Sequence, residues 1–371
     1  MPRTGNVAWL ESLSPWPAEF GLDRMRRLLA DLGDPQRRYP AIHVVGTNGK
    51  GSTTLMTAAL LRAQGRGVGA TISPHVLGWP ERIQLDGAHA DLEAALARVR
   101  PHAERHGATQ FEVVTAAAFA EFAAGNVDVA VVEAGLGGRH DATNVIDARV
   151  VVLTNVARDH TEVLGETREQ IAAEKLAVIT PGATVVVGEP EWEELARANG
   201  AGRVEVVSRA NLALAVAAAE ALLGRVVDPR PAEELRLPGR LERKNEHPLE
   251  IWDGAHNIAG VGYLLPRLPD RRFTIVASIL RDKNVDAMLR ALAAVGDVLV
   301  ATESSNARAV PAGELARLAE PHFGHVEAVD DPGRARDRGR ELAGAEGALL
   351  VTGSTYLLAD LSQQTYDVPR P

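Results

Sequence analysis

The sequence predicts an α/β protein with two domains, each built on a largely parallel sheet. Three observations lead to this prediction. Apolar runs typical of buried strands alternate with helical patterns along most of the chain. A glycine-rich loop joins the first of these strands to a helix. A stretch with three prolines and mixed charge, residues 224–240, interrupts the alternation, which then restarts.

The first strand, the glycine loop and the helix occupy residues 41–61, AIHVVGTNGKGSTTLMTAALL. Glycines let backbone N–H groups turn inward, and the following helix N-terminus adds partial positive charge, so such a loop favours a polyphosphate. Lys50 supplies a full charge and Ser52 a hydroxyl for Mg²⁺. The order GTNGKGS differs from the usual GxxxxGK[ST] because Gly51 separates the lysine from the serine. The alternative is a purely structural glycine turn.

Composition narrows the class of protein. With 371 residues the chain is long enough for two or three domains, and its 46% hydrophobic and 24% charged residues are typical of soluble proteins. It has no apolar run long enough to span a membrane and no secretory signal, so we expect a cytoplasmic protein without a membrane partner. The absence of cysteine excludes thiolate metal sites and thiol nucleophiles. A net charge of −9 argues against a nucleic-acid partner.

Further strands of the first domain end in polar side chains. Residues 66–73 form a predicted strand that ends at Ser73, and a buried strand ends at Glu133. A third, ARVVVLTNV, is followed shortly by His160. Because ligands of open parallel sheets bind at the carboxyl ends of the strands, these residues are candidates for one site. Helices are predicted at residues 21–36, 91–106, 111–124, 167–179 and 211–223, and a loop or hairpin at 78–87.

The first domain is predicted to span residues 1–225 and the second 241–371, with a linker at 226–240. The second domain has five strand-like segments with helical patterns between them: LEIWDGAHN, RRFTIVASI, GDVLVATES, HVEAVDD and ALLVTGST.

Several motifs occur in order along nearly the whole chain: LDRMRRLLADLGDPQ, HVVGTNGKGST, SPHVLGWPERI, FEVVTAAAF, VVEAGLGGRHDATNVI, LTNVARDHTEVLGETREQIAAEK, PGRLE, DGAHN and GSTYLL. With these motifs the sequence resembles the Mur ligase superfamily and, within it, the folylpolyglutamate synthase and dihydrofolate synthase family. The resemblance implies a P-loop NTPase-like first domain and a Rossmann-like second domain. The SPH…ERI and GLGGRxDATN stretches favour the folate branch over the cell-wall ligases.

The resemblance also implies an activity, an ATP-dependent amide ligation. A carboxylate attacks the γ-phosphate of ATP to give an acyl phosphate and ADP, and the amine of L-glutamate then displaces phosphate. The expected ligands are ATP, Mg²⁺ at two sites, dihydropteroate or a folate, and L-glutamate. We expect a monomer.

Individual roles follow from the resemblance, residue by residue. The predicted catalytic residues are Lys50, Glu133, His160 and Lys175. The predicted nucleotide contacts are Asn48, Gly49, Lys50, Gly51, Ser52, Thr53, Asn211, Arg240 and Asp253. The predicted metal ligands are Ser52, Ser73, Glu133 and His160. The predicted substrate contacts are Arg82, Phe111, Asp141, His256 and Ser354. In the family, the lysine that corresponds to Lys175 can carry a carbamate derived from CO₂.

Each role has a plain structural alternative. Ser52 and Asn211 could cap helices. Glu133 could form a salt bridge, and His160 could be a structural hydrogen-bonding group. Lys175 could be a surface lysine on an amphipathic helix.

The chain departs from the family pattern at Pro80, Arg158, Ile258 and Thr355, none of which removes a reacting group. Between Glu189 and Ser208 it is also shorter than is usual in the family. Two rival functions remain at this point: a cell-wall Mur-type ligase, and a nucleotide-binding protein without catalytic activity.

Overall fold

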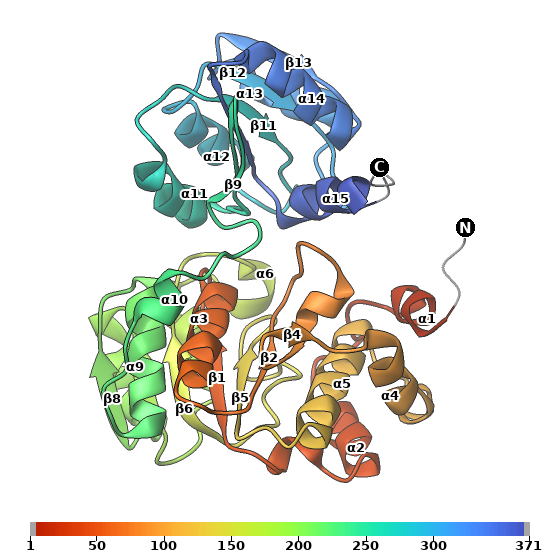
Figure 1. Cartoon of the computed structure of the whole chain (residues 1–371), viewed down its shortest axis with the longest axis vertical. Coiled ribbons are helices and arrows are strands. Elements are labelled where there is room, and N and C mark those ends of the chain that lie inside the picture. Colours follow the sequence, from red (N-terminus) through yellow and green to blue (C-terminus); the bar gives the residue numbers. More distant parts are fainter. Residues whose placement is uncertain (1–4, 367–371) are drawn as a thin grey trace. The chain divides into compact units, whose positions relative to one another are not determined.

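The computed structural model describes residues 5–366. These divide into two compact α/β units (Figure 1). The first contains the chain up to residue 74 together with 79–235, and the second contains 75–78 and the chain from 236 onward. The four residues 75–78 therefore belong to the second unit, where Val76 is buried among apolar side chains. The two-unit α/β fold class is confirmed.

The sheet of the first unit has eight strands in the order β4-β3-β2-β5-β1-β6-β7-β8. From β2 to β8 all neighbours pair in parallel, whereas β3 and β4 form an antiparallel hairpin at one edge. The strands are β1 (Ala41–Val45), β2 (Val68–Thr71), β3 (Ile83–Leu85), β4 (Ala88–His89), β5 (Val129–Glu133), β6 (Ala148–Leu153), β7 (Thr184–Val187) and β8 (Arg203–Val206).

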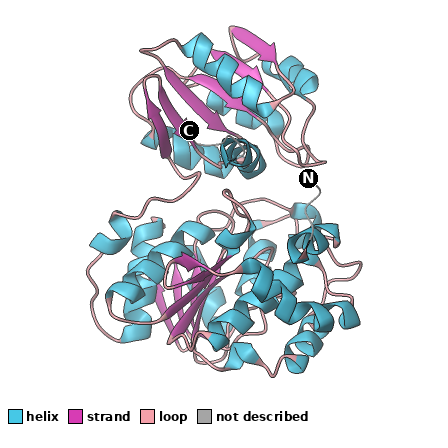
Figure 2. Cartoon of the chain, turned by 45° about the vertical axis from the view of Figure 1, so that its right-hand side comes forward, coloured by secondary structure: helices cyan, strands magenta, loops and turns pink. Residues whose placement is uncertain are grey.

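Helices cover both faces of this sheet (Figure 2). On one face α3 and α9 pack together over a Val- and Ala-rich core. On the other, α2, α4 and α5 enclose a larger core that includes Phe119 and Phe122. The helices are α1 (Asn6–Ser12), α2 (Asp23–Asp31), α3 (Lys50–Ala63), α4 (Leu92–His106), α5 (Gln110–Ala124), α6 (Thr161–Leu164), α7 (Arg168–Leu176), α8 (Glu193–Ala198), α9 (Asn211–Leu223) and α10 (Arg230–Glu233), with short 3₁₀ turns η1 (Pro35–Arg37), η2 (Trp79–Arg82) and η3 (Pro190–Trp192).

The second unit has a six-stranded sheet in the order β13-β12-β11-β14-β10-β9, parallel except for β9. Its strands are β9 (Glu242–Glu246), β10 (Leu249–Trp252), β11 (Thr274–Ala277), β12 (Val298–Ala301), β13 (His325–Ala328) and β14 (Ala348–Thr352). Its helices are α11 (Ile258–Leu264), α12 (Val285–Leu292), α13 (Ala312–Ala319), α14 (Pro332–Ala343) and α15 (Thr355–Tyr366), with the 3₁₀ turn η4 (Leu265–Arg267).

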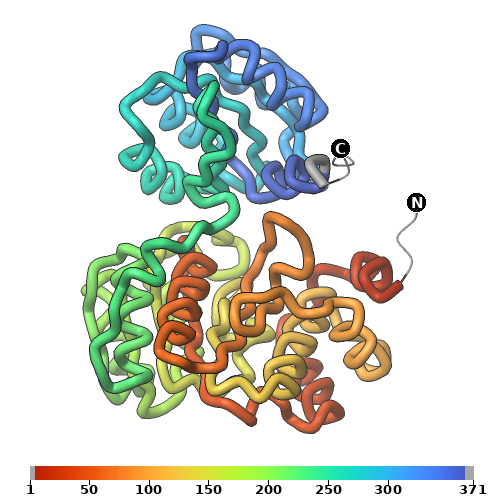
Figure 3. The backbone as a smooth tube through the Cα atoms, in the orientation of Figure 1, coloured from red at the N-terminus to blue at the C-terminus, as the bar shows by residue number. Residues whose placement is uncertain are grey.

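The sequence patterns missed several elements, among them α1, α6, α10 and β9. The stretch predicted as a linker contains α10, which packs against α3 and lies in the green run that follows α9 in Figure 3. Strand β9, ERKNE, is polar throughout and mostly exposed, so it shows no apolar alternation. It forms because β10 offers an antiparallel partner.

Among residues 5–366, no helix combines the length and apolar character that crossing a bilayer requires.

Candidate active site

The glycine loop leaves β1 and ends in the first turn of α3. Gly49 has φ +81°, a left-handed conformation that suits glycine, and it caps α3 without any side-chain hydrogen bond. The helix therefore begins at Lys50, whose Nζ donates to the Thr47 carbonyl at 3.4 Å. The alternative in which Ser52 caps the helix is wrong, because Ser52 lies inside the first turn.

A second loop, directly after β6, holds the glycine loop in place. Asn155 accepts a hydrogen bond from the Asn48 N–H at 3.1 Å and donates to the Asn48 carbonyl at 2.8 Å. The Thr154 hydroxyl also donates to the Asn48 carbonyl, at 2.7 Å. The Thr47 hydroxyl accepts from the Ala157 N–H at 3.0 Å. The motif LTNVARDHTEVLGETREQIAAEK includes Thr154 and Asn155, but no role was expected for either residue.

Glu133 lies at the end of β5, next to the first turn of α3. The carboxylate lies so close to Gly51 that a Cβ added to this glycine would be 3.1 Å from it. The carboxylate also accepts a hydrogen bond from the Ser73 N–H at 2.8 Å. The parallel register of β1, β2 and β5 thus brings Glu133, Ser73 and the glycine loop together. Glu133 is only 5% exposed, and the position of its carboxylate beside the glycine loop suits a divalent cation.

Lys175 is buried on α7 and is only 3% exposed. Its Nζ donates to the Gly46 carbonyl at 2.9 Å, so it contacts the glycine loop directly. Burial, together with the nearby charge of Lys50, lowers the pKa of Lys175 to about 7. The surface-lysine alternative is therefore wrong. Gly138 permits this close packing, because a Cβ there would lie 2.6 Å from the Lys175 carbonyl oxygen.

His160 precedes α6 with φ +51°, an unusual value for a residue with a side chain. Its N–H donates to the Asp159 carboxylate at 3.0 Å, and its ring nitrogens lie 3.9 Å from Asp159 and from Glu162. The side chain of Asp159 is 8% exposed. Asp159 was not among the predicted site residues, although it directly precedes His160.

Asn211 is the first residue of α9, and Ala210 caps that helix without a side-chain hydrogen bond. The helix-cap alternative for Asn211 is therefore wrong. Its side-chain oxygen instead fills the space beside Gly49, where a Cβ would collide with it. The packing of α9 on α3 thus brings an amide side chain to the glycine loop.

Phe111 and Asp141 lie together around Gly135, where a Cβ would be 2.6 Å from the Phe111 ring and 3.1 Å from the Asp141 carboxylate. Asp141 accepts hydrogen bonds from the Leu136 N–H at 2.7 Å and from the N–H and hydroxyl of Thr143. Burial raises the pKa of this carboxyl group, and those hydrogen bonds oppose the rise.

The buried ring of His43, in the middle of β1, lies 2.8 Å from the Thr143 hydroxyl, and burial lowers the pKa of His43 to about 3. The sequence reasoning missed this histidine because its neighbours in the strand are apolar.

The guanidinium of Arg82 lies over the Trp79 ring, 4.5 Å from its centroid.

The remaining predicted residues belong to the second unit. Asp253 accepts hydrogen bonds from the N–H groups of Leu241 and Ala255, both at 2.9 Å. Burial raises the pKa of Asp253, while the positive charge of Arg240 opposes this shift. Arg240 donates to the Gly239 carbonyl at 2.8 Å.

The other two predicted residues in the second unit are His256 and Ser354. A ring nitrogen of His256 is 3.0 Å from the Gly254 carbonyl. The buried hydroxyl of Ser354 accepts from the Tyr356 N–H at 3.1 Å. These residues follow β10 and β14, which are neighbours in the second sheet.

The first unit fits a nucleotide and a magnesium ion. The glycine loop has Gly49 in the left-handed conformation at the start of α3. In the first turn of α3, the buried Thr53 hydroxyl has no hydrogen-bond partner among the described residues. Those residues contain no cluster of three or more His, Cys, Asp or Glu side chains suited to a metal. Magnesium in nucleotide sites commonly takes one or two protein oxygens and completes its shell with phosphates and water, so the Ser52 hydroxyl and the Glu133 carboxylate offer suitable oxygen atoms for one ion.

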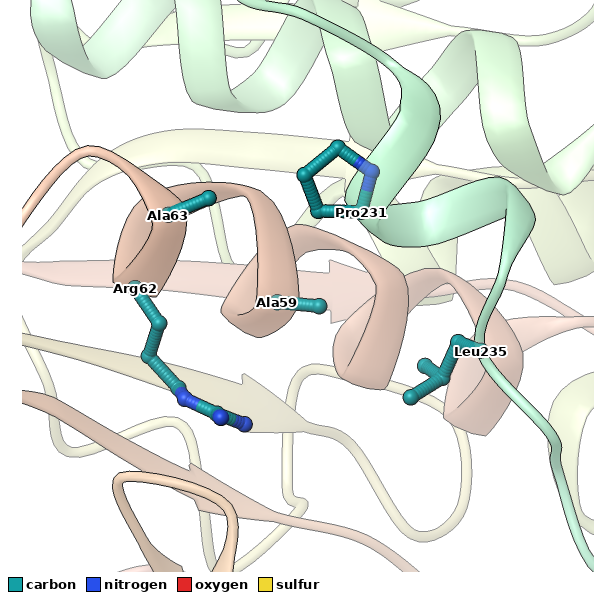
Figure 4. Close-up of a pocket in the computed structure, with 5 residues that line it drawn as sticks. All are labelled: Ala59, Arg62, Ala63, Pro231 and Leu235. Atoms are coloured by element: carbon teal, nitrogen blue, oxygen red, sulfur yellow. The ribbon is translucent and has the colours of Figure 1, made fainter.

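A shallow hollow of about 330 Å³ lies elsewhere, beside the last turns of α3 (Figure 4). It is lined by Ala59, Arg62, Ala63, Pro231 and Leu235. At ~1.5 Å of rise per residue, Arg62 is ~18 Å along the helix from Lys50, so this hollow is distinct from the glycine-loop site.

Comparisons with known proteins identify the class of protein. The Mur ligase middle domain matches residues 44–215, and the Mur ligase glutamate ligase domain matches residues 239–355. The chain therefore belongs to the Mur ligases.

More particularly, it belongs to the dihydrofolate synthase/folylpolyglutamate synthase family. It is 31% identical to the dihydrofolate synthase/folylpolyglutamate synthase of Bacillus subtilis, over 96% of this chain and 97% of that protein. It is similar to the structure of Escherichia coli FolC in complex with DHPP and ADP, with a TM-score of 0.88, 29% identity and 99% of each chain covered. The Yersinia pestis bifunctional enzyme complexed with AMPPNP and Mn has the same TM-score, identity and coverage.

Proposed function

We propose that the chain is an ATP-dependent ligase that joins L-glutamate to folates and to dihydropteroate through an acyl phosphate. The observation that carries the proposal is the convergence of Lys50, Glu133 and Lys175 on one glycine loop. The ligands of the related structures, ADP with DHPP and AMPPNP with Mn, support the same assignment. Because such a ligase consumes ATP and L-glutamate, we place it in the cytoplasm.

In this proposal Lys50 neutralises the β- and γ-phosphates, and the N–H groups of the loop and of the first turn of α3 bind their oxygens. Ser52 and Glu133 would hold a magnesium ion, and Ser73 and His160 would hold a second one. Magnesium supplies charge neutralisation during phosphoryl transfer. The Ser73 N–H fixes the orientation of the Glu133 carboxylate. Asn48, Gly49, Gly51, Thr53 and Asn211 complete the nucleotide site.

The acceptor substrate is assigned to Phe111 and Asp141, with Arg82 at the rim. The ring offers an aromatic face for a pterin, and the carboxylate, held by three hydrogen-bond donors, accepts hydrogen bonds from the pterin N–H groups. Arg240 and Asp253 are assigned to the nucleotide, and His256 and Ser354 to L-glutamate.

Lys175 is assigned a carbamate. Protonated Lys175 first loses one proton, because only a neutral amine attacks CO₂. The N–C bond then forms as a C=O π bond of CO₂ opens onto oxygen and a second proton leaves the nitrogen, so that overall a cation becomes an anion. A pKa of about 7 leaves a large neutral fraction at neutral pH. An anion at this position would lie near the Lys50 charge, which otherwise disfavours protonated Lys175.

The test is ADP release by the purified protein with Mg²⁺, ATP and L-glutamate, comparing dihydropteroate with tetrahydrofolate as acceptor. We expect turnover with both, and a fall of about 100- to 1,000-fold in Lys50→Ala because a phosphate-neutralising charge is lost. Turnover with tetrahydrofolate alone would restrict the activity to chain extension. If neither acceptor supports ADP release, the rival functions are tested next, a UDP-linked peptide serving as the substrate of a cell-wall ligase.

A further inference from the structure

Three side chains, Arg168, Glu189 and Trp192, fix the loop after β6, and we call them the Val156 clamp. Both polar backbone groups of Val156 bond to this clamp. The Val156 N–H donates to Glu189 at 2.9 Å, and the Val156 carbonyl accepts from Nε of Arg168, also at 2.9 Å. Val156 is only 3% exposed, so without the clamp its N–H and carbonyl would be buried without partners.

The clamp is bonded together internally. One oxygen of Glu189 also accepts from the Trp192 indole N–H at 2.9 Å and from Arg168 at 3.2 Å. Arg168 pairs with Glu191 at 2.6 Å, and its guanidinium stacks over the Trp192 ring, 5.2 Å from the centroid. A guanidinium in such a network has little freedom to leave Val156.

Strand register explains why Glu189 reaches this loop. Leu153 pairs with Val187 in the parallel β6–β7 ladder, so the residues that follow the two strands continue side by side. Gly188 then packs against the Thr154 carbonyl, where a Cβ would collide. Arg168 arrives from the first turn of α7, which a capping box at Thr167 fixes.

The loop after β6, which the Val156 clamp fixes, in turn fixes the glycine loop. Thr154 and Asn155 bond to Asn48, and Ala157 bonds to Thr47. Val156 lies between these contacts, so a shift of its backbone displaces the partners of both Thr47 and Asn48. The same segment leads directly to Asp159 and His160.

We propose that Arg168, Glu189 and Trp192 are positioning residues for nucleotide binding, which act through Val156 on the glycine loop. The bonds described above run to Val156 and within the clamp, and not to the glycine loop. The inference rests on the proposed function only in taking the glycine loop as the nucleotide site.

Magnesium-ADP affinity and amide hydrogen exchange, measured well below the melting temperature, test this proposal. In Arg168→Leu we expect the Kd for ADP to rise ~10-fold, because hydrogen bonds to charged groups are lost and buried backbone groups are left unpaired. Exchange should accelerate in peptides covering residues 46–50 and 154–160, and not in β11. The milder Trp192→Phe keeps the ring but removes the indole N–H, and should raise the Kd by a smaller factor.

Arg197→Leu is the matched control. Arg197 pairs with Glu193 at 2.6 Å on the surface of α8, close in sequence to the clamp and in an ordinary i, i+4 pair. We expect less than ~2-fold change in Kd and no change in exchange of the two loops.

A clamp that only stabilises the fold would lower the melting temperature of Arg168→Leu while leaving the Kd and the exchange of both loops at wild-type values; that result would overturn the proposal. If wild-type protein bound no ADP, the proposed function would fail. The hydrogen-exchange data would then show, without the Kd, whether the Val156 clamp fixes the two loops.

Discussion

At the scale of single residues, the nucleotide site depends on burial as much as on residue type. Lys175 illustrates this, because an amine inside the protein beside the Gly46 carbonyl titrates very differently from one in water. Sequence reasoning named the residue through a motif. Its burial, which makes a neutral amine available, came from the packing of α7 on the glycine loop.

We expect burial of Lys175 to make stability depend on pH. Its folded pKa of about 7 lies below the unfolded value of 10.5, so between these values the unfolded chain binds more protons and this group's contribution to stability increases with pH. Below pH ~7 both states are protonated and the penalty is constant. Relative to wild type, Lys175→Met should therefore gain melting temperature as the pH falls from 9.5 to 7, without nucleotide or metal and under CO₂-free conditions.

A constant difference between the two melting curves across that pH range would contradict this expectation. The carbamate has a separate readout, a ¹³C NMR signal after addition of ¹³C-bicarbonate at pH 8. We expect that signal in wild type and not in Lys175→Met.

At the scale of helices and strands, small residues set how closely layers approach. Gly339 lies in α14 where a Cβ would be 2.6 Å from a Val276 methyl group and 2.8 Å from Leu349. Gly262 in α11 has nothing within 4 Å of the same position. The two glycines look alike in the sequence, since each sits within a helical pattern.

We expect opposite effects from adding one methyl group at these positions. Gly339→Ala should lower the free energy of unfolding by about 1–3 kcal/mol, because the core under α14 is overpacked. Gly262→Ala should raise it by about 0.5–1 kcal/mol, because alanine has the higher helix propensity. Urea unfolding of the two variants beside wild type measures both. Equal effects at the two sites would show that helix propensity alone governs them.

At the scale of the whole molecule, each unit has its own sheet and its own hydrophobic clusters. The structure assigns the glycine loop, Glu133 and Lys175 to the first unit and Asp253 to the second. The expected monomeric state stays a prediction.

Separate cores predict two calorimetric transitions. Magnesium-ADP at 100 times its Kd should stabilise the nucleotide-binding unit by about 2.7 kcal/mol, since the ligand binds only the folded state. Differential scanning calorimetry should therefore show one transition moving further than the other. The shift should be lost in Gly49→Ala, where φ of +81° and the collision with Asn211 distort the loop. A single transition in wild type would contradict the independence of the two cores.

Much of the fold was predictable from local pattern. The strands that lead to Val45, Glu133 and Leu153 are largely apolar, interrupted only by His43 in β1 and Arg149 in β6. The helix at residues 211–223 was predicted at its observed bounds. Strand β9 and the start of α3 at Lys50 were not, because tertiary pairing and the left-handed conformation of Gly49 decided them.

The sequence by itself determined the order of strands and helices, the glycine loop with Lys50, and the motif residues of the family, because these depend on residue type and spacing along the chain. Only the tertiary structure decided that Lys175 is buried against Gly46, that Asn211 packs beside Gly49, and that Arg168 and Glu189 hold Val156. The reason is physical. Burial, register and close approach arise between segments far apart in the chain, and no local periodicity encodes them.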